Sequence, residues 1–415
     1  MSEKRLKIFI SAYACEPEKG SEPGIGWNVV NELAKYHEVH VLTRANNQAA
    51  IQTALAGREN LPVFHYYDLP KYLSFWKKKR RGYHLYYYLW QYGAYFKFRR
   101  FVNCSGFDIV QHLTFANFAM PSLFMFCKPL TVWGPIGRTA VPKAVQRALP
   151  WKIKLKERLR QFAMWLNCHF ELCRVLTPVF ADRIIECGLP PGESAFPARW
   201  KNKIVQHPQT GINPDEPEYG CVRRRREDGK IRLLICSEFL HWKGVTFGAE
   251  TFGRIASRRK DVELWIYGSG PEEKSMRCIF KQYGVENAVT WKGFVSKAEM
   301  MQALCDADIL LYPSYHHGLA TVILQAMYVG LPIVTIAGDP VAQCVAEGGG
   351  MVADGADMAA ILDDLEAKTL RLIDSGEERR KIGEQGMRLV RERYNWRILT
   401  RRLSDILQGF AGEER

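Results

Sequence analysis

The fold of this chain is decided by residues 231–267, which read IRLLICSEFLHWKGVTFGAETFGRIASRRKDVELWIY. Two short apolar runs, Ile231–Cys236 and Val262–Tyr267, flank a segment with helical spacing at Val245–Ser257. Short runs of β-branched and other apolar residues are typical of strands that are buried on both faces of a sheet. The stretch therefore predicts a strand–helix–strand unit of a parallel sheet.

The same alternation extends in both directions along the chain. Downstream we predict strands at Val289–Trp291, Ile309–Tyr312 and Pro332–Thr335, separated by helices at Glu272–Tyr283, Lys297–Leu304 and Leu319–Val329. Upstream, a helix is predicted from about Trp27 to Tyr36, and apolar runs predict strands at Leu6–Tyr13, Val39–Thr43, Asp108–His112, Leu130–Trp133, Cys173–Leu176 and Ile204–Val205. We expect an α/β protein with two doubly wound, Rossmann-like domains, which bind ligands at the carboxyl ends of their strands and in the cleft between them.

Length and composition agree with two globular domains. The chain has 415 residues, of which 47% are apolar and 25% are charged, and this length is too great for one typical domain. A stretch with prolines, glycines and a basic cluster at 214–229 is the predicted linker between domains at 1–213 and 230–393. No apolar run reaches the roughly 18 residues that a membrane span needs, and the start does not resemble a secretory signal. We therefore expect a cytoplasmic chain.

The 11 cysteines are scattered without a CxxC pair. Neither a disulfide framework nor a zinc site follows from such a pattern.

The positive charge is concentrated in one segment. The formal net charge is +14, and residues 69–156 contain 16 Lys and Arg but a single acid, Asp108. Within this segment, the basic run Lys77, Lys78, Lys79, Arg80 and Arg81 is followed by many Tyr, Trp and Phe residues up to Phe101. Basic residues interleaved with interfacial aromatics favour an anionic membrane surface or a lipid-linked acceptor. Nucleic acid and a solvated helix with inward-facing rings are the alternatives, and nucleic acid is the least favoured.

A glycine-rich stretch follows the first predicted strand. Residues 20–27 read GSEPGIGW, and Gly24 and Gly26 stand just before the predicted helix. Free backbone amides at the start of a helix attract anions, and glycines allow a phosphate to approach closely. The alternative is a tight turn without a ligand.

In the predicted second domain, most strands are followed by a short motif. These are Trp242-Lys-Gly244, Tyr267-Gly-Ser-Gly-Pro271, Gly293-Phe294, Tyr312-Pro-Ser314 and the stretch from His317 to Met327. In this order they resemble the retaining glycosyltransferases of family 4, which have the two-domain GT-B architecture. The last residues, 394–415, resemble the terminal helix that crosses back onto the first domain in that family.

The resemblance implies transfer of a hexose from a nucleotide-diphosphate sugar to an acceptor hydroxyl with retention, without a metal or other cofactor. It also implies a role in cell-surface polysaccharide or lipid-linked glycan synthesis at the inner face of the cell membrane. The alternative is a catalytically impaired relative that serves as a binding or partner subunit. A dehydrogenase is disfavoured because no GxGxxG follows the first strand.

Site residues follow from the same resemblance. The implied catalytic residues are His112, Lys243 and His317. The implied donor-binding residues are Gly24, Gly26, Gly268, Gly270, Glu238, Leu319, Ala320, Thr321 and Gln325. Arg138 and the basic run 77–81 are expected to face the acceptor or the membrane.

Three positions depart from the family pattern. Glu238 stands where an arginine is usual, and His317 and Gln325 stand where the family has two glutamates. Asp306-Ala-Asp308 spells a DxD motif, but it precedes a predicted strand rather than following one, so no metal site is expected there.

Overall fold

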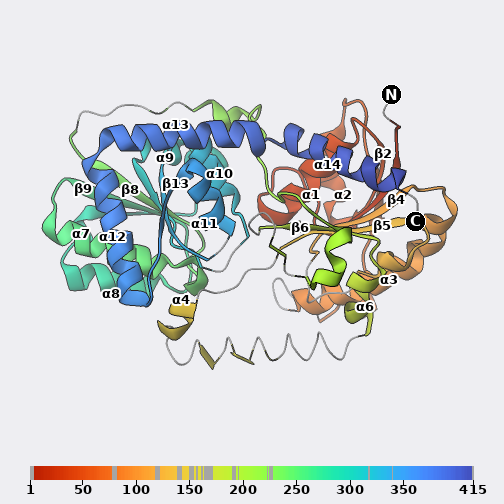
Figure 1. Ribbon diagram of the computed structural model, residues 1–415, viewed down its shortest axis with the longest axis horizontal. Coiled ribbons are helices and arrows are strands. Elements are labelled where there is room, and N and C mark those ends of the chain that lie inside the picture. Colours follow the sequence, from red (N-terminus) through yellow and green to blue (C-terminus); the bar gives the residue numbers. More distant parts are fainter. Residues whose placement is uncertain are drawn as a thin grey trace. The chain divides into compact units, whose positions relative to one another are not determined.

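The computed structural model describes residues 4–76, 82–116, 122–137, 143–148, 154–155, 158–159, 162, 172–188, 193–194, 196–221, 223, 228–315, 318–338 and 340–413. The chain forms two compact α/β units (Figure 1). The first unit comprises residues 1–137, 155–210 and 396–415, and the second comprises 138–154 and 211–395.

The first unit is built on a seven-stranded parallel sheet with the order β3-β2-β1-β4-β5-β6-β7. Its strands are β1 (Lys7–Ala12), β2 (Glu38–Arg44), β3 (Val63–Tyr67), β4 (Ile109–Thr114), β5 (Leu130–Gly137), β6 (Arg183–Cys187) and β7 (Ile204–Gln206). One face packs against α1 (Ser21–Leu33), α2 (Gln48–Leu55) and α14 (Trp396–Gly412). The other face packs against α3 (Tyr83–Cys104) and the 3-10 turn η3 (Leu123–Phe126), and α6 (Leu172–Phe180) lies beside η3.

The second unit is built on a six-stranded parallel sheet with the order β10-β9-β8-β11-β12-β13. Its strands are β8 (Ile231–Cys236), β9 (Val262–Tyr267), β10 (Val289–Gly293), β11 (Ile309–Leu311), β12 (Ile333–Ile336) and β13 (Gly350–Ala353). One face is covered by α7 (Val245–Arg258), α8 (Glu273–Tyr283) and α12 (Met358–Asp374). The other is covered by α9 (Lys297–Asp306), α10 (Thr321–Tyr328), α11 (Pro340–Cys344) and α13 (Gly376–Arg393). The expected fold class of two doubly wound domains is confirmed.

Each sheet reverses its strand order at one point. In the first unit this point lies between β1 and β4, and in the second it lies between β8 and β11. At such a point the loops that follow the two central strands run to opposite faces of the sheet, so ligands bind in the crevice between them. The fold therefore gives each unit one favoured place for a functional site.

Several predicted elements need correction. The run Cys173–Leu176 is not a strand but lies in α6, and strands β3, β6 and β13 were not predicted. The first helix begins at Ser21 rather than near Trp27. Pro23 is compatible with this earlier start, because a proline in the first helical turn gives up an amide that has no partner within the helix.

The described residues at the start of the expected linker pack on the second unit instead. Tyr219, in the 3-10 turn η5 (Pro217–Gly220), is buried in the apolar cluster around α10. Arg223 donates to the carbonyl oxygens of Gly330 and Ala307 at 2.6 and 2.8 Å. The start of this segment is therefore part of the second domain. Residues 143–148 also form a short helix, α4 (Lys143–Ala148), that groups with this unit rather than with the first domain as expected.

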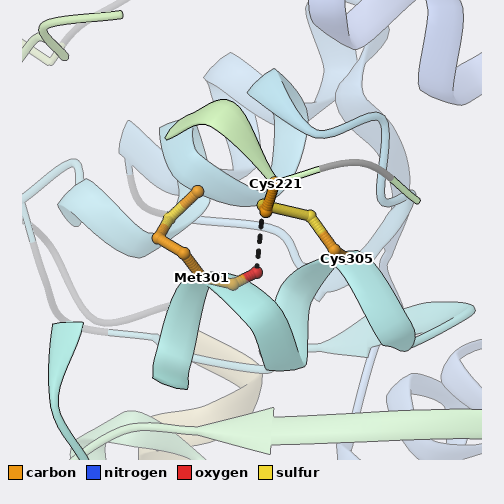
Figure 2. Close-up of a disulfide and its surroundings, with 3 residues drawn as sticks. All are labelled: Cys221, Met301 and Cys305. Carbon is orange, nitrogen blue, oxygen red and sulfur yellow. Dashed lines mark hydrogen bonds between the residues drawn. A yellow bond between two sulfur atoms is a disulfide. The ribbon is translucent and has the colours of Figure 1, made fainter. Parts of the chain in front are cut away.

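A disulfide joins this segment to α9. Cys221 and Cys305 are bonded, with their Cα atoms 6.6 Å apart, and the sulfur of Cys221 lies 3.5 Å from the carbonyl oxygen of Met301 one turn earlier in α9 (Figure 2). The two cysteines are 84 residues apart in the sequence. Their spacing alone did not predict the pairing, because only the packing of η5 beside α9 brings them together.

The C-terminal helix α14 belongs to the first unit, as the resemblance implied. Its apolar face, with Leu399, Leu403 and Leu407, is buried against α1 and the first sheet. Two buried histidines fasten it: His37 contacts the Ser404 hydroxyl at 2.9 Å, and His207 Nε2 donates to the Leu399 carbonyl oxygen at 2.9 Å. The last helix of the chain thus completes the core of the first domain.

Candidate functional site

In the second unit, the point of strand reversal carries a lysine–tyrosine pair. Lys243 ends the 3-10 turn His241–Lys243 that follows β8, and Tyr312 directly follows β11. The Lys243 ammonium donates to the Tyr312 hydroxyl at 3.0 Å and lies 5.6 Å from the centroid of the same ring. A half-buried cation is thereby held at the carboxyl ends of the two central strands, where an α/β sheet binds its ligands.

Two glycines allow the loops around Lys243 to approach one another. Gly244 adopts a left-handed conformation with a φ of +63°, and a Cβ there would lie 1.9 Å from the carbonyl oxygen of Pro313. Gly268, after β9, has a φ of +120°, and a Cβ there would lie 2.0 Å from the carbonyl oxygen of Ser237. At these two positions the backbones of the loops after β8, β9 and β11 therefore approach one another so closely that a side chain larger than that of glycine would clash.

The other expected donor-binding residues lie in or beside these loops. Glu238 is half-buried in the loop after β8, and the amide of Phe239 next to it donates to the carbonyl oxygen of Ser269 between Gly268 and Gly270. This hydrogen bond ties the loop after β8 to the loop after β9.

The first turn of α10 holds the next group of expected donor residues. Leu319 and Ala320 precede the helix, Thr321 begins it, and no side chain caps its N-terminus. The Gln325 amide in the same helix donates to the buried Tyr219 hydroxyl at 3.3 Å. The structure thus gives Gln325 a partner from η5, and its role in donor binding stays a prediction.

In the first unit, Gly24 and Gly26 lie inside α1 rather than before it. A Cβ on Gly24 would lie 2.1 Å from the carbonyl oxygen of Lys19, and one on Gly26 would lie 2.2 Å from that of Ala14. Both glycines are therefore needed for close packing of the helix against the loop after β1. Because only the first four amides of a helix lack an internal partner, the amides of Gly26 and Trp27 are not available to an anion in the way the sequence suggested.

His112 lies on β4 at the reversal point of the first sheet, opposite Ser11 of β1. Its ring is buried, and both nitrogens are engaged. Nε2 lies 3.1 Å from the Thr114 carbonyl oxygen and 3.1 Å from the Tyr87 hydroxyl, whereas Nδ1 lies 2.5 Å from the Ser122 hydroxyl. Because a carbonyl oxygen only accepts, Nε2 carries the proton and the Ser122 hydroxyl donates to Nδ1. The catalytic role implied for His112 stays a prediction. A contact of its ring nitrogens with a ligand would require one of these hydrogen bonds to break.

We expect His112 to make the stability of the protein depend on pH. Burial lowers the pKa of His112 to about 4, although the hydrogen bond to Thr114 opposes this shift. The unfolded chain, with a histidine pKa near 6.5, therefore binds the proton more readily, so this contribution is complete above pH 6.5 and is lost as the pH falls toward 4. Lowering the pH from 7 to 5 is expected to remove about 2 kcal/mol of the free energy of unfolding through this residue.

This dependence is measurable by urea denaturation at both pH values. In His112→Asn the difference between pH 7 and pH 5 is expected to shrink by that amount, whereas replacement of the exposed His84 on α3 by Asn is expected to leave it unchanged. An undiminished difference in His112→Asn would show that other groups cause the acid sensitivity.

Some expected site residues cannot be placed. Lys77, Lys78, Lys79, Arg80, Arg81, Arg138 and His317 all lie outside the described residues. Of the others, the structure brings the loops of Lys243, Glu238, Gly268 and Gly270 together in the second unit, while Gly24, Gly26 and His112 lie in the first.

The DxD carboxylates lie near the amino end of β11, whereas Tyr312 lies at the carboxyl end of the same strand. Asp308 precedes β11, and its Oδ2 accepts from the backbone amide of Arg232 at 2.8 Å. Within the described part of the chain, no group of three His, Cys, Asp or Glu side chains is arranged to hold a metal ion.

The sequence did not single out three interactions that the structure reveals. They are the Tyr312 hydroxyl as the partner of Lys243, the pairing of Arg44 with Asp68, and the carboxylate of Glu22, which accepts from the Phe115 amide and from Gln209 at 3.2 and 3.1 Å. A charged residue at a strand end, such as Arg44, was the available signal.

Comparison with known sequences agrees with this geometry. Residues 222–388 match the family described as glycosyl transferases group 1. The chain is 28% identical over 230 residues to the GDP-mannose-dependent monoacylated alpha-(1-6)-phosphatidylinositol monomannoside mannosyltransferase of Corynebacterium glutamicum. The aligned region covers 51% of this chain and 59% of that protein. It is also 28% identical over 187 residues to the MMP alpha-(1->4)-mannosyltransferase of Mycolicibacterium hassiacum. This aligned region covers 44% of this chain and 42% of that protein. The chain thus spans about half the length of these relatives.

Solved structures show the same fold over nearly the whole chain. WaaG, a glycosyltransferase involved in lipopolysaccharide biosynthesis, superposes with a TM-score of 0.60 at 16% identity and covers 97% of this chain and 100% of its own. The sucrose-phosphate synthase of Thermosynechococcus elongatus superposes with a TM-score of 0.64 at 15% identity. The superposition covers 99% of this chain and 100% of that chain. These likenesses confirm the two-domain GT-B architecture.

Proposed function

We propose that the chain transfers a hexose from a nucleotide-diphosphate sugar to an acceptor hydroxyl, because residues 222–388 match the family described as glycosyl transferases group 1 and the chain has the GT-B fold. The observation that carries this proposal is the position of Lys243 at the strand reversal of the second unit. Breaking the bond between the sugar and the diphosphate leaves negative charge on the phosphate oxygen. A cation fixed before the reaction stabilises that charge without needing to reorganise.

We propose that the reaction retains the configuration of the sugar and needs no metal. In such a transfer the acceptor hydroxyl approaches from the side on which the diphosphate leaves, so the departing phosphate oxygen is close enough to take the hydroxyl proton. Lys243, hydrogen-bonded to Tyr312, supplies positive charge that a metal would otherwise supply. The loop glycines Gly268 and Gly270 leave the backbone near this charge free of side chains.

Donor turnover tests the proposal directly. We expect the purified protein, given a panel of uridine and guanosine diphosphate sugars with and without acceptors, to release nucleoside diphosphate from at least one of them. The rate is expected to be unchanged by EDTA, because protein groups and not a metal hold the diphosphate. Loss of turnover on chelation, with recovery on addition of magnesium or manganese, would contradict metal independence.

A catalytically impaired relative is the second candidate. Glu238 places a carboxylate in the loop that precedes Lys243, and the Gln325 amide is engaged by Tyr219. Titration of the protein with nucleoside diphosphates separates the two candidates, because an impaired relative is expected to show little or no affinity for them.

We also propose that the enzyme works at an anionic membrane surface. None of the helices in the described ranges is both long and apolar enough to cross a membrane. Along α3, however, Leu85, Tyr88, Tyr92, Phe96 and Arg99 recur every three or four residues, so they share one face of the helix. Leu85 and Phe96 are 53% and 60% exposed on it.

Further exposed rings precede the basic run. Tyr72 and Phe75 are 73% and 77% exposed, a few residues before Lys77. Large apolar groups in contact with water next to several cations are typical of a peripheral membrane surface.

Vesicle sedimentation checks this surface. We expect the protein to sediment with vesicles that contain anionic lipid, and less so as the salt concentration rises, since salt screens the attraction. Replacing Lys77, Lys78, Lys79, Arg80 and Arg81 with Glu is expected to abolish sedimentation. The matched control replaces Lys274 and Lys281 of α8 with Glu. Equal sedimentation of the wild type and the variant with five substitutions would rule out docking through this segment.

A further inference from the structure

Arg44 is a fixed cation at the carboxyl end of β2 in the first unit. Its guanidinium carbon lies 5.4 Å from the centroid of the Tyr13 ring and 5.2 Å from that of Tyr86. Its Nε donates to Asp68 Oδ1 at 3.1 Å, and the Tyr86 hydroxyl donates to the same oxygen at 2.7 Å. Two rings and a carboxylate thus hold the guanidinium in one orientation.

Among the described residues, the terminal nitrogens of this guanidinium have no hydrogen-bond partner. The Arg44 side chain is 17% exposed. The terminal nitrogens therefore carry up to four N–H donors that are not engaged by the described residues. The planar fork of an arginine matches the two oxygens of a carboxylate or phosphate, and such paired hydrogen bonds are among the strongest in proteins.

An aromatic wall stands beside the cation. Tyr83 of α3 and Phe115 after β4 are half-buried, with ring centroids 5.7 Å apart, and both pack against the Tyr13 ring, at 6.0 and 5.4 Å. Burial raises the pKa of Tyr83, whereas the positive charge of Arg44 opposes this increase. The Arg44 guanidinium therefore lies close enough to Tyr83 to interact with it electrostatically. Aromatic surfaces with a few fixed polar groups are typical of sites that bind organic ligands.

Two carboxylates near the cluster are already engaged. Glu22 accepts hydrogen bonds from the Phe115 amide and from Gln209, and Asp68 accepts from Arg44 and Tyr86. Asp68 lies on the Nε side of the guanidinium, which leaves the terminal nitrogens to a ligand. The cluster also adjoins the strand reversal between β1 and β4, because Tyr13 follows β1 and Phe115 follows β4.

We propose that Arg44 binds an oxyanion of the acceptor and makes the enzyme select an acceptor that carries a phosphate or carboxylate group. A sugar ring of that acceptor would lie against Tyr83 and Phe115, with its charged group at the terminal nitrogens of Arg44. This inference rests on the proposed function, because it names the acceptor class for the same transfer reaction.

The test compares matched acceptors. Octyl glucoside is neutral, octyl glucuronide carries a carboxylate, and octyl glucoside 6-phosphate carries a phosphate, so the preferred member also identifies the oxyanion. With the donor that the wild type turns over, we expect kcat/KM to be about tenfold to a hundredfold higher for a charged acceptor than for the neutral one, as for a charged hydrogen-bonded pair. Arg44→Gln is expected to remove this preference and leave kcat/KM for the neutral acceptor nearly unchanged.

Two further variants keep the result interpretable. Arg44→Lys retains the charge without the fork and is expected to keep part of the preference. Arg58→Gln changes an exposed arginine after α2 in the same unit and is expected to change nothing. Direct titration with the three glycosides provides a second readout if the acceptors bind but are not glycosylated.

The outcomes also separate this inference from the proposed function. A wild type that hydrolyses the donor but neither prefers nor binds a charged glycoside overturns the inference alone. The same holds if Arg44→Gln lowers transfer to all three acceptors equally, which indicates a structural role. A wild type that neither binds nucleoside diphosphates nor turns over any donor overturns the proposed function.

Discussion

Replacing Lys243 with alanine is expected to lower kcat of sugar transfer several hundredfold. Lys243 is the cation that the fold fixes at the reversal point of the second sheet, hydrogen-bonded to Tyr312. A single charged contact made to the transition state is worth about 3 to 4 kcal/mol, which corresponds to a few hundredfold in rate. Glu238, in the loop that precedes Lys243, is a carboxylate and supplies no compensating positive charge. Single-turnover measurement of diphosphate release isolates the chemical step.

The control is Lys281→Ala, which removes an exposed lysine of α8 in the same unit and is expected to leave kcat unchanged. Tyr312→Phe removes only the hydroxyl that orients the ammonium, so we expect a smaller loss, of roughly tenfold, as for one hydrogen bond to a charged group. A Lys243→Ala protein with ordinary kcat would mean that the diphosphate does not bind at this reversal point.

Replacing Gly244 with alanine is expected to cost about 2 to 4 kcal/mol in the free energy of unfolding, from strain and overpacking together. At this position a Cβ would lie 1.9 Å from the carbonyl oxygen of Pro313, and the backbone has a φ of +63°. The loop after β8 must then move away from the loop after β11. Because Lys243 directly precedes Gly244, the affinity for nucleoside diphosphate is expected to fall as well. Urea denaturation and calorimetric titration measure the two effects.

Gly284, after α8, provides a matched control. Its φ is +65°, almost the same as that of Gly244, but a Cβ there would meet no atom within 4 Å. Gly284→Ala is therefore expected to show only the backbone strain, about 1 kcal/mol, with no change in diphosphate affinity. Equal losses of stability in the two variants would show that the contact with Pro313 is easily relieved.

Much of the fold was predictable because the central strands of a parallel sheet are buried on both faces. Such strands consist almost entirely of apolar residues, as in β8 and β9, so the sequence alone marks them. The strands that were missed carry polar residues or lie at an edge: β6 contains Arg183 and Glu186, and β3 and β13 are edge strands. The apolar run at Cys173–Leu176 was assigned incorrectly, because four residues are too few to show whether the period is that of a strand or a helix.

The sequence by itself determined the two α/β domains and the strand-end loops that hold Lys243, Gly268 and Gly270. Only the tertiary structure decided which of these loops meet. Lys243 reaches Tyr312, 69 residues away, because β8 lies beside β11 in the sheet although β9 and β10 come between them in the chain. The pairing of Cys221 with Cys305 depends in the same way on the packing of η5 against α9. Hydrophobic periodicity is a local property of the chain, whereas strand order is set by the crossovers that let all the apolar faces be buried at once.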